Sequence, residues 1–457
     1  MPPPAPHPTS PESGPSGPEP SDQPNPILTE PELVSQDVAF PPPAPGTGSP
    51  RRAAAAFIFF TVTLDMLALG MIAPVLPRLI TGFLGGNQVS ASQMIGVFAT
   101  LFAAMQFFFS PVLGSLSDRF GRRPIVLLSN FGMAADYVVM ALAATLPWLF
   151  VGRIVSGLTA SSIPTAFAYL ADVTPREHRA AAFGFLNAAF GIGFVLGPAL
   201  GGVLGNVNPR LPFWVAGGLS LLNGCYGLFV LPESLPQSLR SPFSWRRANP
   251  VGSLALFRSA KGLLPIAGLL LLGYIAQQSL ANVFVIYADF RYGWTDRTVG
   301  LSLALIGIFT ALYGVFLVKP AVKHLGERRS MIIGFLGGSL GYLFFGLSRT
   351  GLLFWLGIPL LNLMSLTWPS AQSIMSHSIG PSEQGQLQGA INSLRGISGL
   401  LGPGLFTWIF SKSIGPHPVI HAPGMPFYTA AAMLLLALLL TTSATPAKSP
   451  PKPANAL

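Results

Sequence analysis

The sequence predicts an all-α membrane protein with twelve transmembrane helices and a disordered N-terminal tail. Half of the 457 residues are hydrophobic and only 9% are charged, whereas soluble domains carry about a quarter charged residues. The apolar residues form long continuous segments, which is typical of lipid-spanning helices and not of alternating barrel strands. An internal repeat, described below, divides these segments into two sets of six.

Residues 1–50 predict the tail, because they contain 17 prolines, six acidic residues and no Lys or Arg. A segment with so few apolar residues cannot bury a core. We expect a solvated, inert extension, and docking of a partner is the alternative.

The first bundle of six helices is expected within residues 51–232, since each of its apolar segments approaches the roughly 20 residues that cross a bilayer. The expected spans are 53–80, 90–114, 123–146, 148–172, 179–205 and 211–231. Residues 233–260 are polar, basic and contain proline, which predicts a cytoplasmic linker.

The second bundle is expected within residues 261–444, followed by another disordered tail at 445–457. Its expected spans are 261–289, 296–320, 330–348, 351–378, 384–411 and 423–443. With both termini placed inside, 18 Lys and Arg fall on the cytoplasmic side and six outside. The positive-inside rule therefore predicts cytoplasmic termini and an even number of spans.

The two halves match at a constant offset of 205 residues. The offset relates Gly121 to Gly326, Pro164 to Pro369, Gly184 to Gly389, Asn187 to Asn392, and Gly197-Pro198 to Gly402-Pro403. Two six-helix halves in the same orientation are a transporter plan in which the substrate binds between the halves near mid-membrane.

A dense polar segment, Gly114 to Pro124, joins two apolar segments of the first half. It resembles the loop between helices 2 and 3 of the major facilitator superfamily, and Lys319 to Arg329 resembles the degenerate copy of that loop. Gly193 to Gly202 resembles the helix 5 motif of the drug/proton antiporters, and Gly152 to Gly157 the helix 4 arginine motif. The resemblance covers residues 51–443 and implies that superfamily's fold of two pseudo-symmetric bundles.

A narrower resemblance is to tetracycline-resistance-type efflux proteins. It is carried by Asp65, Ala73 to Pro77, Ala104-Met-Gln106, Ala135-Asp136-Tyr137 and Gln386 to Gly389. The chain departs from that pattern in the second half, where Thr310 and Gly338 lie near the places at which those pumps are expected to carry a His and an acid.

Three ionisable residues lie within first-half spans: Asp65 and Asp136 are deep, and Arg153 is near the outer start of its span. Such groups are costly in hydrocarbon and normally face the bundle interior or a wet cavity. Burial disfavours the charged form of a carboxyl and a nearby cation favours it, so these residues are our candidates for proton coupling. Structural hydrogen bonding of the acids, and snorkelling of Arg153 to the interface, are the alternatives.

The polar loop supplies the candidate gate, made of Asp118, Arg119, Gly121, Arg122 and Arg123. Its arginines fix the loop in the cytoplasm, but topology alone does not require Asp118. The resemblance implies that Asp118 contacts the start of helix 11, near Gln384, and that this contact stabilises the outward-facing state.

The helix 5 motif has no reactive side chains. Its residues Gly193, Gly197, Pro198, Gly201 and Gly202 permit close helix contact and bend the helix, which predicts a tight seam that prevents leakage between the halves.

Polar residues in the remaining spans are candidates for the substrate cavity. They are Gln106, Gln277, Asn282, Asn362, Gln372, Asn392 and Arg395. Arg395 is the one deep charge of the second half, and either an anionic or polar substrate group or a backbone carbonyl could face it.

These observations favour a proton-coupled exporter of amphipathic small molecules, tetracycline-like or multidrug, in a bacterial cytoplasmic membrane. A proton-coupled uptake symporter for a sugar or other metabolite on the same fold is the alternative. A membrane enzyme or sensor is disfavoured, since the sequence shows no nucleophile–base set, metal-ligand spacing or output domain. We expect a monomer that uses the proton gradient, with no cofactor, no metal and no nucleic-acid partner.

Overall fold

The computed structural model describes residues 50–160, 162–175, 178–243, 245, 249, 252–259, 262–379, 383–415 and 422–443. Of the expected tails, residues 1–49 and 445–457 lie outside the described residues, as do parts of the linker, whereas Pro50 is the first residue of a helix. Within the described part the chain is helical and contains no strand, which confirms the all-α prediction.

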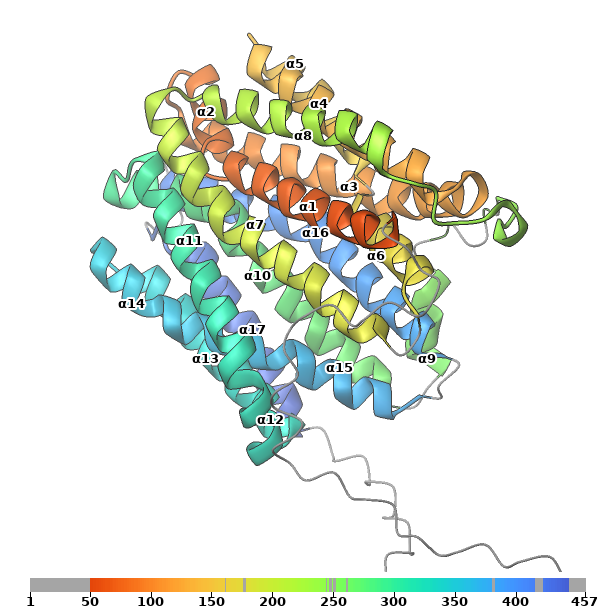
Figure 1. Cartoon of the computed structure of the whole chain (residues 1–457). Helices are drawn as coiled ribbons and strands as arrows, with labels where there is room; N and C mark the ends of the chain where they lie inside the picture. The colour runs from red at the N-terminus through yellow and green to blue at the C-terminus, as the bar shows by residue number, and fades with distance from the viewer. Residues whose placement is uncertain are drawn as a thin grey trace, which may run out of the picture. The chain divides into compact units, whose positions relative to one another are not determined.

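The described part of the first half comprises eight helices (Figure 1). They are α1 (Pro50–Ile72), α2 (Leu76–Phe83), α3 (Gln88–Phe120), α4 (Arg122–Leu142), α5 (Leu146–Thr159), α6 (Ser162–Val173), α7 (Arg179–Val207) and α8 (Leu211–Val230). Two expected spans are thus each divided in two. Pro74 lies between α1 and α2, where a proline cannot donate the helical hydrogen bond and also restricts the residue before it.

Short 3-10 helices η3 (Gln237–Leu239) and η4 (Gly252–Ala255) and the one-turn α9 (Leu256–Ser259) occupy the described part of the linker. The second half then comprises α10 (Leu263–Tyr292), α11 (Asp296–Leu312), the π-helix η5 (Tyr313–Leu317), α12 (Val318–Leu325), α13 (Glu327–Leu347), α14 (Gly351–Asn362), the 3-10 helix η6 (Leu363–Leu366), α15 (Thr367–His377), α16 (Gln384–Ile414) and α17 (Met425–Ser443).

Ten helical segments of the described chain are long and apolar enough to cross a membrane, and Met425–Thr441 is a shorter apolar helix. The remaining expected span is α16, which has 31 residues but is rich in Gly, Ser and Gln. All twelve expected spans are therefore helical, although α16 is less apolar than the composition argument assumed.

The helix bounds follow the sequence repeat. The starts of α4, α5 and α7 at Arg122, Leu146 and Arg179 recur 205 residues later at Glu327, Gly351 and Gln384, where α13, α14 and α16 begin. The offset fails at the last helix, because α17 begins at Met425 rather than at residue 416.

Two pairs of helices make the most extensive contacts between the described parts of the two halves. α3 packs along α16, and α7 packs along α11. The repeat relates these seams, because Gly96 of α3 lies against Thr407 of α16, whereas Gly300 of α11 lies against Gly202 of α7. Since Thr407 follows Gly202 by 205 residues and Gly300 follows Gly96 by 204, the two seams are copies of one contact.

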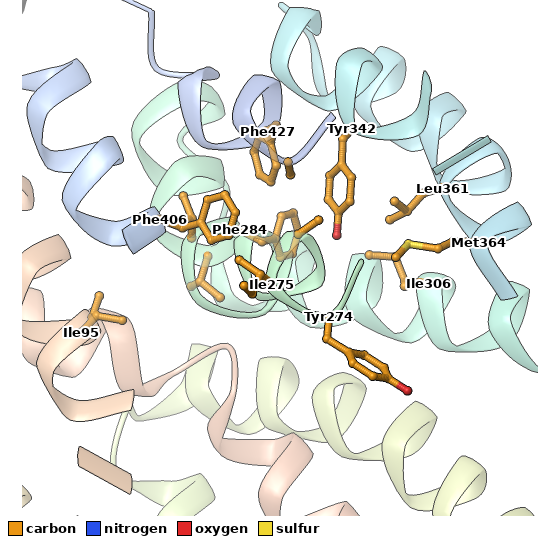
Figure 2. Close-up of a cluster of buried hydrophobic side chains, with 14 of the residues drawn as sticks. Ile95, Tyr274, Ile275, Phe284, Ile306, Tyr342, Leu361, Met364, Phe406 and Phe427 are labelled. Atoms are coloured by element: carbon orange, nitrogen blue, oxygen red, sulfur yellow. The ribbon is translucent and has the colours of Figure 1, made fainter. Parts of the chain in front are cut away.

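Aromatic side chains form the centre of the second half (Figure 2). The rings of Phe345 and Phe354 stack at 3.9 Å between centroids, and Phe284 stacks on Phe354 at 5.1 Å. Tyr274, in contrast, points away from the other labelled side chains of this cluster.

Candidate functional site

Asp136 of α4 and Arg153 of α5 form a buried ion pair. Arg153 Nη2 donates to Asp136 Oδ2 at 3.0 Å, and the side chains are 8% and 0% exposed respectively. The guanidinium also lies 5.4 Å from the centroid of the Phe102 ring, on α3. Arg153 therefore does not snorkel to the surface; its charge is neutralised inside the first half.

Glycine at position 152 lets this pair form. A Cβ there would lie 2.5 Å from Asp136 Oδ1 and 3.1 Å from Met140 Cγ. The glycine of the helix 4 motif thus provides the space that the neighbouring acid occupies.

Asp65 of α1 is 1% exposed and lies at the same cavity as Arg153. The cavity has about 510 Å³ of empty space, part of it open to solvent. Its lining includes the predicted residue Gln106 together with Phe102, Met133 and Tyr137. The structure therefore brings the three predicted proton-coupling residues together, two at the cavity wall and Asp136 through its pair with Arg153.

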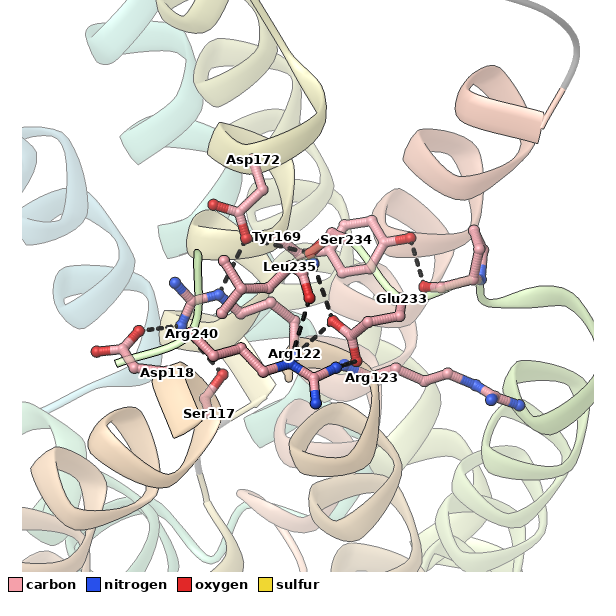
Figure 3. A network of polar contacts seen from close by, with 11 residues as sticks. Ser117, Asp118, Arg122, Arg123, Tyr169, Asp172, Glu233, Ser234, Leu235 and Arg240 are labelled. Atoms are coloured by element: carbon pink, nitrogen blue, oxygen red, sulfur yellow. Dashed lines mark hydrogen bonds and ion pairs between the residues drawn. The ribbon is translucent and has the colours of Figure 1, made fainter. Parts of the chain in front are cut away.

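Three predicted gate residues, Asp118, Arg122 and Arg123, belong to a polar cluster at one end of the first half (Figure 3). We call this end of the protein the basic face. Arg122 is its centre, since it contacts Asp118 Oδ1 at 2.5 Å, Asp172 Oδ2 at 3.0 Å and Ser117 Oγ at 3.2 Å. Arg119 is exposed and lies 5.1 Å from the ring of Phe120. All these partners belong to the first half.

Glu233 binds the start of α4 at this face. Its carboxylate accepts hydrogen bonds from the backbone N–H groups of Arg122 at 2.8 Å and Arg123 at 3.3 Å, a favourable position for an anion at a helix N-terminus. Gly121 makes room for it, because its φ of 108° lies in the left-handed region and a Cβ would collide with the Glu233 carboxylate.

The predicted contact of Asp118 with the start of the eleventh span is replaced by other pairs in this structure. Asp118 binds Arg122, and the Gln384 side chain donates to the Ser376 carbonyl oxygen at 2.9 Å. Sequence reasoning also missed Asp172 and Glu233. Both acidic residues follow closely on the end of an expected span, on the same side of the membrane as the basic loop. This position in the sequence could have indicated that they pair with the loop arginines.

A second ionic cluster joins the halves at the opposite face. Arg78 of α2 pairs with Asp296 at 3.1 Å and Asp289 at 3.5 Å, and it donates to the Trp294 carbonyl oxygen. Gln88 Nε2 also donates to Asp289, at 2.9 Å. Sequence analysis counted Arg78 only as an outside charge, because nothing local in the sequence places it beside acids more than 200 residues away.

The helix 5 glycines divide between two neighbours. Cβ atoms on Gly193 and Gly197 would lie 2.5 Å and 2.7 Å from backbone carbonyl oxygens of Thr63 and Leu67 on α1, and Gly201 lies against Met71 of the same helix. Gly202 instead lies against Asp296 and Gly300 of the second half, and Gly300 also meets Pro198. The predicted seam between halves is therefore made by Pro198 and Gly202, whereas the other three glycines hold the first half together.

A model of the Major Facilitator Superfamily matches residues 58–403 and 281–457. The chain belongs to this superfamily. Among curated relatives, the class C tetracycline resistance protein of Escherichia coli is 37% identical over 387 residues, which cover 83% of this chain and 94% of the relative. The class G protein of Vibrio anguillarum is 35% identical over 370 residues, covering 80% and 92%.

Solved structures support the major facilitator fold. The human organic anion transporter MFSD10 matches with a TM-score of 0.64 and 23% identity, over 86% of this chain and all of that one. The superfamily prediction made from the loop and helix 5 motifs is thus confirmed, and the protein is a multi-pass membrane protein.

The second half of this superfamily member holds most of the predicted cavity residues, but the structure does not gather them at the Asp65 cavity. Asn282 Nδ2 donates to Gln278 Oε1 at 3.1 Å, and Asn362 accepts from Thr310 Oγ1 at 2.6 Å. These two side chains are engaged within their own half. Gln277 and Asn392 are exposed, and Gln372 is half-buried.

Arg395 of α16 is exposed and lies 5.2 Å from the centroid of the Tyr274 ring. It meets an aromatic face rather than a backbone carbonyl oxygen. Across the described residues, no group of three or more His, Cys, Asp or Glu side chains could hold a metal ion.

Proposed function

We propose that this protein exports amphipathic small molecules in exchange for protons by alternating access. One observation carries the proposal: three ionisable residues meet inside a membrane-spanning bundle, and two of them line a cavity. Intramembrane charges of this kind mark proton relays and substrate pathways. The curated relatives named tetracycline resistance proteins support drug efflux as the direction.

Proton exchange would use the competition between Asp65 and Asp136 for the Arg153 charge. With Asp136 bound to Arg153, the cation is neutralised, and Asp65 at the same cavity can carry a proton. Loss or gain of that proton changes the charge of the cavity. This change would shift the equilibrium between the inward-facing and outward-facing states.

The contacts between halves suggest which state is present. α3 meets α16 at Ser92, Gly96, Ala103 and Phe107, and the Arg78 cluster lies at the same end of the bundle as Ser92 and Gln88. These contacts close the face of the protein that is opposite the basic face. At the basic face Asp118 is paired within its own half, so we assign an inward-facing state if the basic face is cytoplasmic.

That orientation follows the positive-inside rule, with the Arg122 loop in the cytoplasm. We place the protein in a bacterial cytoplasmic membrane with both termini inside, as a monomer that performs no covalent chemistry. Asp118 would then exchange its Arg122 contact for the start of α16 when the protein faces outward.

The uptake symporter remains the second candidate, because the fold does not fix the direction of transport. Inverted vesicles acidified inside separate the two: an exporter accumulates substrate there, and a symporter expels it. Asp65→Asn should abolish the response to the pH gradient while substrate exchange without a gradient continues. Unchanged proton-driven efflux in both Asp65→Asn and Asp136→Asn would refute the coupling assignment.

A further inference from the structure

A second site of distinct chemistry lies in the second half, where three helices bring one cation and two aromatic rings into a single stack. Arg395 of α16 lies 5.2 Å from the centroid of Tyr274 on α10. The Tyr274 ring stacks on Trp368 of α15 at 4.4 Å between centroids, with an interplanar angle of 10°. We call this arrangement the Arg395 stack.

No ion pair among the described residues neutralises the charge of Arg395. Ion pairs among the described residues involve Arg78, Arg122, Arg153, Arg240 and His377, and Arg395 takes part in none of them. Arg153 in the first half has Asp136, so the two deep arginines differ. A cation–π contact is worth about 0.5–2 kcal/mol and leaves the edge of the guanidinium free to donate hydrogen bonds.

Arg395 is also deep, since it lies eleven residues after the start of α16, about 16 Å at the helical rise. It is nevertheless exposed. Its neighbour Gly396 packs against Phe107 of α3, and Gln106 beside Phe107 lines the Asp65 cavity. Arg395 is therefore the sequence neighbour of a residue in the α3–α16 seam between the halves.

On each of the three helices a polar residue lies one helical turn from the member of the stack. Gln277 follows Tyr274 by three positions, Gln372 follows Trp368 by four, and Asn392 precedes Arg395 by three. Residues at these spacings share a helix face. Three of the five predicted polar cavity residues of the second half therefore lie one helical turn from a member of the Arg395 stack.

We propose that the Arg395 stack binds a planar, negatively charged group of the transported molecule, such as a carboxylate or enolate on an aromatic ring system. The guanidinium would donate a bidentate pair of hydrogen bonds to the two oxygens, and the Tyr274 ring would hold the guanidinium in place through the cation–π contact. This inference rests on the proposed function in one respect, namely that the bound ligand is the transported molecule. Binding at the stack does not depend on proton coupling.

Equilibrium dialysis of the purified full-length protein tests the site with three probes of one shape: radiolabelled 2-naphthoate, its neutral methyl ester, and 2-naphthylmethylammonium. We expect the wild type to bind naphthoate more tightly than the other two. Arg395→Gln should weaken naphthoate binding by about tenfold or more, as expected for losing hydrogen bonds to a charged group. Arg395→Lys should recover part of the loss, since it keeps the charge without the planar fork.

The aromatic members give a second comparison. Tyr274→Phe retains the ring and should bind as the wild type does, whereas Tyr274→Leu should bind naphthoate more weakly. Arg349→Gln, which changes an exposed arginine between α13 and α14, is the matched control and should have no effect. Equal thermal unfolding midpoints identify variants that are folded.

The outcomes separate this inference from the proposed function. Equal naphthoate binding by the wild type and Arg395→Gln overturns the site, as does preference for the ester or the ammonium, or failure of all three probes to bind. Proton-driven accumulation in inverted proteoliposomes is measured independently. Binding with no proton-driven accumulation refutes the exporter and retains the site, whereas transport without naphthoate binding does the reverse.

Discussion

The Asp136–Arg153 pair shows how two residues allow a membrane-spanning bundle to contain buried charges. Each charge alone would be expensive in hydrocarbon, and together they neutralise each other at 3.0 Å. Removing one partner leaves an uncompensated charge, which is more costly than removing both. Each partner is therefore required for stability as long as the other is present, whether or not the pair also carries protons.

We predict that Asp136→Asn destabilises the protein by about 3–5 kcal/mol, because it leaves Arg153 buried without its acid. Arg153→Gln alone should destabilise it less, since a carboxyl can protonate. The double variant Asp136→Asn/Arg153→Gln should be more stable than Asp136→Asn. Thermal unfolding of the purified variants measures this, and a double variant no more stable than Asp136→Asn would contradict the pairing.

At the scale of elements, the contact between α1 and α7 depends on glycines of α7 that lie against the backbone of α1. A Cβ at Gly197 would lie 2.7 Å from Leu67 O and 2.8 Å from Gly70 Cα. Backbone cannot move aside as a flexible side chain can, so this seam accepts no larger residue. Two positions of the same helix, Gly184 and Gly191, have open space instead.

We therefore predict that Gly197→Ala lowers the unfolding midpoint and Gly191→Ala does not. In Gly191→Ala the replacement meets no atom within 4 Å, and alanine favours the helix by about 1 kcal/mol relative to glycine. The two variants make the same chemical change in one helix. Equal midpoints would show that α1 and α7 are not packed as described.

The Arg78 cluster connects helices of different halves, whereas the α1–α7 contact connects helices within the first half. It joins α2 to the end of α10 and the start of α11 through Asp289 and Asp296. Asp296 is 3% exposed, and its main chain also packs against Gly202 of α7. Breaking the Arg78 cluster should favour opening of the face at which the cluster lies, which is the face opposite the basic face.

We predict that Arg78→Gln increases labelling of a cysteine at position 92 by a membrane-impermeant maleimide several-fold. Ser92 is buried at the α3–α16 seam, where its hydroxyl donates to the Thr407 carbonyl oxygen at 2.7 Å. The background carries Ser92→Cys and Cys225→Ala. Arg297→Gln, an exposed arginine next to Asp296, is the control; if both variants label equally, Arg78 does not hold this face closed.

At the scale of the whole molecule, transport requires the α3–α16 and α7–α11 seams to open and close while each half keeps its packing. The first seam offers a direct test at Ala103, whose Cβ would lie 3.3 Å from a Cβ on Gly399. Disulfides need Cβ atoms about 3.5–4.5 Å apart, so a small adjustment suffices.

We predict that Ala103→Cys/Gly399→Cys in the Cys225→Ala background cross-links on oxidation and stops transport, and that dithiothreitol restores it. Gly338→Cys/Met364→Cys is the matched pair within the second half, where the Cβ atoms would lie 3.4 Å apart. Its cross-link should leave transport intact. Transport that continues through a complete Ala103–Gly399 cross-link would exclude rocking at this seam.

The sequence by itself determined the helices, the repeat and the superfamily. Long apolar segments must be helical in lipid, since each backbone group has to be satisfied within its own segment. The offset of 205 residues therefore reappears in the starts of α13, α14 and α16. The buried acids Asp65 and Asp136 were also recognisable, because charge is rare and costly in such segments.

Only the tertiary structure decided which charges meet. The Asp136–Arg153 pair, the attachment of Arg78 to Asp289 and Asp296, and the placement of Arg395 over Tyr274 all join residues on different helices. Composition and spacing report the cost of a buried charge along one helix. The partner that offsets this cost is selected by how the helices pack against one another, and that packing depends on side-chain contacts between segments far apart in the chain.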